Sequence, residues 1–207
     1  GTVRFPTNVD LAADLVNIWV DQGQLEMAGQ AFESLKEIPV SRWNWRAFIF
    51  SGDYLLTTGQ EDQAYAIWEE FRNQLPSDER GYSAEGVFLF ERGKIPECVE
   101  LLKGALAACG HAPQSALTLS RAYLSIGEYA DAIEAANRAV EATFDEQLSV
   151  DQQAVLFYRA AAEDGLAHRW LDEGHQAHPE FSTLVVNCFA DYGLVQSLPS
   201  RAIRTLG

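Results

Sequence analysis

The sequence predicts an all-α solenoid built from antiparallel helix pairs. Glycines recur at a nearly constant spacing, and apolar residues recur at three- and four-residue steps on both sides of them. The hydrophobic content of 47% over 207 residues is enough to build a core. No apolar run approaches the roughly 20 residues that a membrane span needs. Stacked amphipathic helices satisfy all three observations.

The repeated unit contains a glycine with an apolar or aromatic residue four places before it and a small residue five places after it. Five copies centre on Gly23, Gly59, Gly93, Gly127 and Gly165, at intervals of 36, 34, 34 and 38 residues. Four places before the glycines stand Trp19, Leu55, Leu89, Tyr123 and Ala161. Five places after them stand Ala28, Ala64, Cys98, Ala132 and Trp170, so the fifth copy breaks the small-residue rule. We expect each glycine to form the turn between two helices, because glycine readily adopts positive φ.

These markers resemble the tetratricopeptide repeat, a helix pair of 34 residues. The second copy matches with Gly52, Leu55, Gly59, Ala64, Trp68, Phe71 and Pro76, and the fourth with Leu119, Tyr123, Gly127, Tyr129, Ala132 and Ala139. The resemblance implies a right-handed superhelical solenoid in which the first helix of each pair lines a concave groove.

The predicted organisation is one solenoid domain with short additions at its ends. Residues 1–8 are a lead-in, and residues 9–181 hold the five repeats. Residues 182–207 are expected to form capping helices, over 182–192 and 199–205. A terminal repeat otherwise leaves an apolar face in water, which is why a cap is expected.

The resemblance also indicates which side chains face the groove. Most of the expected groove residues are polar, and four of the chain's twelve arginines are among them. The predicted peptide- or protein-binding residues are Asn17, Arg46, Phe50, Asp53, Arg80, Val87, Gln114, Arg121, Gln152 and Arg159. Arginine holds carboxylates or peptide carbonyls through paired hydrogen bonds, so the four arginines are expected to anchor a ligand. In the alternative interpretation they lie on a solvated face, paired with Asp53, Glu85 or Glu163.

The charge of the chain narrows the choice of partner. Fifteen basic against thirty acidic residues give a net charge of −15, which repels nucleic acid and anionic membranes. The three cysteines form no CxxC pair, which is typical of a reducing compartment, and the first residues show no secretion signal. We therefore expect a cytoplasmic protein that binds neither nucleic acid nor membrane.

No pattern of residues indicates catalysis, a cofactor or a metal. The sequence has no phosphate-binding loop, GxSxG elbow or HExxH motif. His168, His175 and His178 are close enough in sequence to suggest a metal site, but helix-end histidines are the favoured interpretation. Cys98 is interpreted as a buried packing residue. Trp43 and Trp45, at a repeat junction, are interpreted as packing residues or as a lid or contact patch.

The sequence thus predicts a non-enzymatic scaffold or adaptor that binds a protein or peptide segment in its groove. The alternative is a non-catalytic module of a larger enzyme or of a secretion or polysaccharide-export machine.

Overall fold

The computed structural model describes residues 8–143, 159, 161–163, 165–166 and 169. The chain forms two compact units, residues 1–118 and 119–207, and the boundary between them lies within one helix. The predicted capping helices at 182–207, and Gln152, lie outside the described residues.

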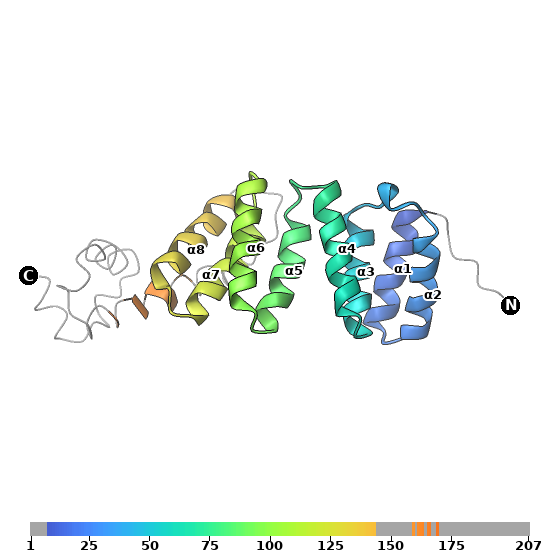
Figure 1. Cartoon of the computed structure of the whole chain (residues 1–207), viewed down its shortest axis with the longest axis horizontal. Coiled ribbons are helices and arrows are strands. Elements are labelled where there is room, and N and C mark those ends of the chain that lie inside the picture. The colour runs from blue at the N-terminus through green and yellow to red at the C-terminus, as the bar shows by residue number, and fades with distance from the viewer. Residues whose placement is uncertain (1–7, 144–158, 160, 164, 167–168, 170–207) are drawn as a thin grey trace, which may run out of the picture. The chain divides into compact units, whose positions relative to one another are not determined.

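The described residues form helices that follow one another in antiparallel pairs (Figure 1). The helices are α1 (Val9–Asp21), α2 (Leu25–Lys36), α3 (Trp45–Thr57), α4 (Glu61–Gln74), α5 (Arg80–Glu91), α6 (Ile95–Ala108), α7 (Pro113–Ser125) and α8 (Tyr129–Thr143), with the 3-10 turn η1 (Val40–Arg42) before α3. No strand occurs among the described residues. The predicted all-α architecture of paired helices is confirmed.

The same glycine turn joins the two helices of each pair. Gly23, Gly59, Gly93 and Gly127 have φ between 69° and 76°, as predicted. In the first turn the amide of Gly23 donates to the carbonyl of Val20, and the amide of Gln24 donates to that of Trp19. This pair of bonds is a Schellman motif, which satisfies carbonyls left open at the end of a helix. The bulky residue four places before each glycine therefore supplies a carbonyl to the turn as well as a side chain to the core.

The first helices of the first two pairs begin at asparagine caps. The side chain of Asn8 accepts a hydrogen bond from the amide of Leu11, and Asn44 accepts one from Ala47. Such caps satisfy amides that have no partner inside the helix. Asn44 also donates to Asp10 on α1, so this cap ties the second pair to the first.

The core of the first unit runs between the helix pairs. Phe48 of α3 stacks on Phe71 of α4 with ring centroids 4.9 Å apart, and Trp68 of α4 packs against Phe88 of α5. Full burial of a side chain of this size stabilises the fold by about 1.5–3 kcal/mol. Each pair thus leaves an apolar surface that only the next pair covers.

Small residues bring the helices close together at the predicted positions. Ala28, Ala64, Cys98 and Ala132 are fully buried. Gly52 lies against the indole of Trp68, where an added Cβ would come within 2.7 Å of Cε2. The packing interpretation of Cys98 is confirmed, since its thiol is buried and donates to the carbonyl of Gly86.

The second unit contains the end of α7, α8 and a few described residues beyond them. Ala132 and Ala136 of α8 are buried, and the hydroxyl of Ser120 donates to the carbonyl of Ala132. The prediction that Gly165 forms a turn is wrong, because Gly165 has helical backbone. An added Cβ there would come within 2.6 Å of Cζ of Tyr129, so close packing rather than a turn requires the glycine.

Candidate functional site

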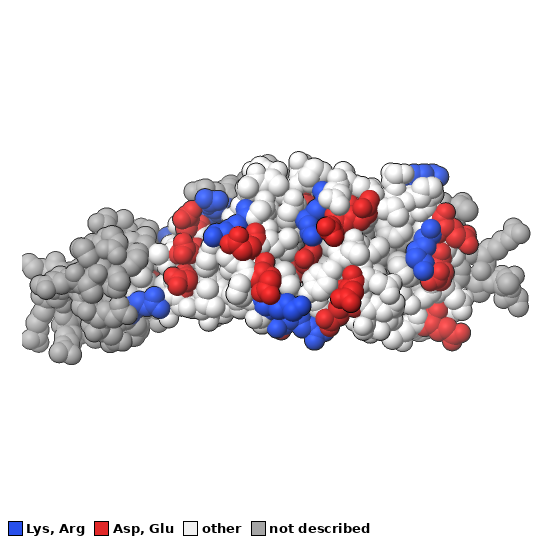
Figure 2. Space-filling view, viewed as in Figure 1, with Lys and Arg blue, Asp and Glu red and all other residues white. Residues whose placement is uncertain are grey.

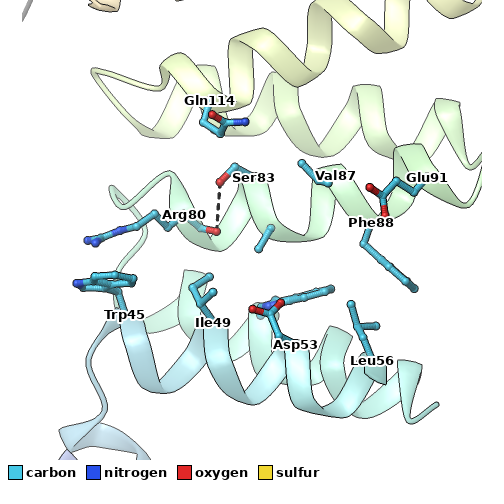
Figure 3. A pocket seen from close by; sticks show the side chains of 12 residues that line it. Trp45, Ile49, Asp53, Leu56, Arg80, Ser83, Val87, Phe88, Glu91 and Gln114 are labelled. Atoms are coloured by element: carbon cyan, nitrogen blue, oxygen red, sulfur yellow. Dashed lines mark hydrogen bonds between the residues drawn. The ribbon is translucent and has the colours of Figure 1, made fainter. Parts of the chain in front are cut away.

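An open pocket of about 440 Å³ lies in the first unit, between the first helices of successive pairs. Its walls come mainly from α3 and α5, with Trp68 of α4 and Gln114 of α7 (Figure 3). On α3, the lining residues Trp45, Ile49, Asp53 and Leu56 recur every three or four positions and share one helix face. The α5 wall consists of Arg80, Ser83, Ala84, Val87, Phe88 and Glu91. The fold therefore assembles the pocket from three consecutive repeats.

A cation and an aromatic ring form one end of the pocket. The guanidinium of Arg80 lies 4.3 Å from the ring centroid of Trp45. The same guanidinium binds Asp78 at both ends, with Nε 2.8 Å from Oδ1 and Nη2 2.5 Å from Oδ2. Arg80 is thus held flat over the indole by a paired hydrogen bond and a cation–π contact.

Apolar side chains line the pocket between its two ends. Ile49 and Leu56 of α3 lie opposite Val87 and Phe88 of α5 (Figure 3). Trp68 of α4, which is 1% exposed, also lines the pocket. An apolar surface that is open to water and flanked by polar groups is typical of a binding site.

Carboxylates occupy the middle and the other end. Asp53 points from α3 toward α5, and Glu91 lies at the end opposite Arg80 and Trp45 (Figure 3). Although Asp53 still reaches solvent, the surrounding helices remove part of its hydration, and the Asp21 carboxylate on α1 repels it. Both effects raise the pKa of Asp53, to about 6. The pocket therefore has a cation that is paired with a carboxylate at one end, and carboxylates in its middle and at its other end.

Four of the predicted groove residues meet in this pocket: Asp53, Arg80, Val87 and Gln114. They were predicted because they occupy positions that face the groove in the tetratricopeptide repeat, which this sequence resembles. Glu91 was not among the predicted groove residues, although its spacing of four residues from Val87 places it on the same face of α5.

The other predicted groove residues that the structure describes lie outside this pocket. Arg46 is 3.5 Å from the carboxylate of Asp14 and contacts the Trp45 ring, and Asn17 donates to Asp21. Phe50 packs at the edge of the core, 6.2 Å from Trp45 between ring centroids. Arg121 lies in the second unit, as does Arg159, whose Nε donates to Glu163 at 3.0 Å.

The two tryptophans at the repeat junction have different surroundings. Trp43 is 5% exposed, and its indole nitrogen donates to the carbonyl of Ile38. The interpretation of Trp43 as part of a lid or contact patch is therefore wrong, because it belongs to the core. Trp45 is half-buried and lines the pocket.

The remaining candidates for chemistry are few. Among the described residues, no three of His, Cys, Asp and Glu gather as metal ligands, and His168, His175 and His178 lie outside them. Within the same part of the chain, no helix has the length and apolar character to cross a membrane. On the face seen in Figure 2, basic side chains lie beside acidic ones. A broad basic surface of the kind that binds nucleic acid is absent from the described residues on that face.

Comparison with known proteins relates the chain to others through structure alone. No family model and no curated protein matches the sequence. The solved structure titled crystal structure of MamA protein aligns with a TM-score of 0.56 and 16% identity, covering 89% of this chain and 94% of that one. Pseudomonas aeruginosa PilF aligns with a TM-score of 0.55 and 17% identity, covering 93% and 92%. The C-terminal part of a TPR repeat-containing protein from Cytophaga hutchinsonii aligns with 0.57 and 12%, covering 97% and 88%.

The structural matches indicate the same fold as the paired helices, the glycine turns and the small residues at the helix contacts. The chain has a tetratricopeptide-type fold.

Proposed function

We propose that the protein is a non-enzymatic scaffold that binds a segment of another protein in the pocket between α3, α5 and α7. The observation that carries this proposal is the pocket itself, where partly buried apolar side chains are flanked by charged groups at both ends. An extended chain segment placed there meets apolar contacts for its side chains and polar contacts for its backbone. Gln114 offers an amide at the edge of the pocket for backbone hydrogen bonds.

The fold supports the same function. Stacked helix pairs present a long surface to a partner without needing a catalytic centre. The likeness to solved tetratricopeptide-type structures supports a scaffold, while the partner follows from the side chains of this chain alone. A cytoplasmic location, and the alternative of a module within a larger enzyme or export machine, stay predictions.

A pair of matched variants tests the proposal. Ala84 lines the pocket, whereas Ala66 is exposed on α4 outside it. We expect Ala84→Trp to fill the pocket and to abolish capture of a partner from native lysate. Ala66→Trp adds the same side chain outside the pocket and should capture the same partner as the original protein. The melting temperature of each variant shows that both are folded.

Retention of the partner by Ala84→Trp would place binding on another surface and contradict the proposal. The same experiment also tests the alternative that the chain is a module of a larger enzyme or export machine. A set of proteins that co-purifies with it in fixed stoichiometry would indicate such an assembly.

A further inference from the structure

We infer that the pocket recognises a basic peptide segment, in which a lysine or arginine stands beside an apolar side chain. This inference rests on the proposed function and specifies the chemistry of the partner. Arginine anchors for a carboxylate were expected from the sequence, and the charges of the pocket favour the opposite polarity.

The cation of the pocket is already compensated. Arg80 makes two hydrogen bonds to Asp78, and its flat face lies on Trp45. A ligand carboxylate at this position would have to compete with the Asp78 carboxylate, which is only two residues away in the chain. Arg46, next to this end, likewise faces Asp14.

The carboxylates of the pocket are not compensated. Neither Asp53 nor Glu91 accepts a hydrogen bond or an ion pair on its carboxylate from any described residue. Some carboxylates of the first unit do have such partners, such as Glu85 with Arg72 and Glu61 with Arg92. The charge that remains for a ligand in this pocket is therefore negative.

The shape of the pocket matches a long basic side chain. Ile49, Val87 and Leu56 form an apolar path that leads past Asp53 toward Glu91 (Figure 3). Lysine and arginine bury an aliphatic stem along apolar surface and keep the charged end beside a carboxylate. An adjacent apolar residue of the peptide would lie on the Trp45 side. The net charge of −15 attracts such a partner from a distance.

The environment of Asp53 adds a dependence on pH. The Asp21 carboxylate from α1 acts on it directly, and the same pocket is lined by Arg80 and Glu91 from α5, Gln114 from α7 and Trp68 from α4. Because the pKa of Asp53 is raised to about 6, the carboxylate is charged at neutral pH and loses its charge under mild acid. Binding of a cation should therefore weaken as the pH falls through about 6.

Selection from a random peptide library displayed on phage tests the inference, with three forms of the protein as bait. The first is the original protein, and the second is the pocket variant Asp53→Asn with Glu91→Gln. The third is Asp62→Asn with Glu69→Gln, which removes two exposed carboxylates from α4 outside the pocket. The second and third baits have the same net charge, so their difference measures local contact rather than long-range attraction.

We expect the original and the control bait to enrich peptides that carry Lys or Arg beside an apolar residue, and the pocket variant not to do so. Fluorescence anisotropy with one enriched peptide should show roughly a tenfold or greater loss of affinity in the pocket variant. Affinity for the original protein should fall between about pH 8 and about pH 5, as Asp53 takes up a proton.

Every other outcome overturns the inference. Enrichment of acidic peptides that is lost on Arg80→Gln, or of apolar peptides without charge, would keep the proposed function and reject the basic ligand. Equal enrichment of basic peptides by the pocket variant and its control would show attraction without recognition. A library that yields only peptides insensitive to Ala84→Trp would reject the proposed function as well.

Discussion

Gly52 and Gly104 both lie inside helices, but a methyl group would meet very different surroundings at the two positions. At Gly52 the added carbon overlaps the buried indole of Trp68. At Gly104 no atom lies within 4 Å. Alanine favours helix over glycine by about 1 kcal/mol at either position, so the difference between them isolates the cost of the overlap.

We expect Gly52→Ala to lower the free energy of unfolding by about 1–3 kcal/mol, because the added methyl group would force the buried indole of Trp68 out of its place. Gly104→Ala should raise it by about 0.5–1 kcal/mol. Urea denaturation followed by tryptophan fluorescence measures both. A gain in stability in both variants would mean that the α3 and α4 contact yields to a methyl group.

Asp53 gives a second prediction for a single residue. Its pKa in the folded protein, about 6, exceeds the ordinary value of 3.8, so the folded state holds the proton more tightly than the unfolded state. Its contribution to stability is therefore largest below about pH 4 and is lost as the pH rises through 6. Ionised Asp53 destabilises the fold at neutral pH, although contact with solvent keeps this effect small.

Asp53→Asn should accordingly raise the melting temperature by about 1–3 °C at about pH 8 and leave it unchanged at about pH 4. Thermal unfolding followed by circular dichroism at the two pH values checks this. An equal change at both pH values would assign the effect to packing instead of charge. A variant that is more stable but binds a basic peptide less well would show that the carboxylate serves binding at the expense of stability.

At the scale of helices, the start of α7 depends on a residue from the preceding repeat. Ala112, just before this helix, has no side chain that can cap it. The carboxylate of Glu79 accepts hydrogen bonds from the amides of Gln114 and Ser115 instead, at 3.4 and 3.0 Å. Partial burial raises the pKa of Glu79 more than these bonds and His111 lower it. The third and fourth repeats are therefore joined by a cap supplied at a distance of 35 residues.

Glu79→Ala should destabilise the protein by about 1–2 kcal/mol, because the two amides lose their acceptor. Glu79→Gln keeps one acceptor oxygen and removes the charge that burial disfavours, so its loss should be smaller. Chemical denaturation of the two variants gives the comparison. If Glu79→Ala leaves the stability unchanged, water takes the place of the carboxylate and the cap is not needed.

At the scale of the molecule, much of the architecture could be predicted from the sequence because it depends on local rules. A glycine between two amphipathic stripes forms a turn wherever positive φ is required, as at Gly23, Gly59, Gly93 and Gly127. The small residues five places later were predictable by another local rule, because two helices that pack closely need small side chains where they meet. Gly165 shows the limit, because a glycine can equally serve close packing inside a helix.

The site was predictable only in part. The face of each first helix identified Asp53, Arg80, Val87 and Gln114. The pairing of their charges was not predictable, since Asp78 lies in a connection before α5 and its position depends on how that segment folds. Trp43 and Trp45 differ by two residues in sequence, yet one is in the core and the other lines the pocket. Burial of this kind depends on tertiary packing rather than on composition.

In the first unit, the principal contacts join helices that are no more than two apart along the chain. The stability of such an array is the sum of the stabilities of single repeats and of the contacts between neighbouring repeats. Unfolding can therefore begin at an end and proceed inward, without crossing a single global barrier. The pocket spans α3, α5 and the beginning of α7, so a bound segment would connect repeats that otherwise communicate only through their neighbours. An occupant would contact three repeats at once. Its binding free energy would therefore make these three repeats unfold together.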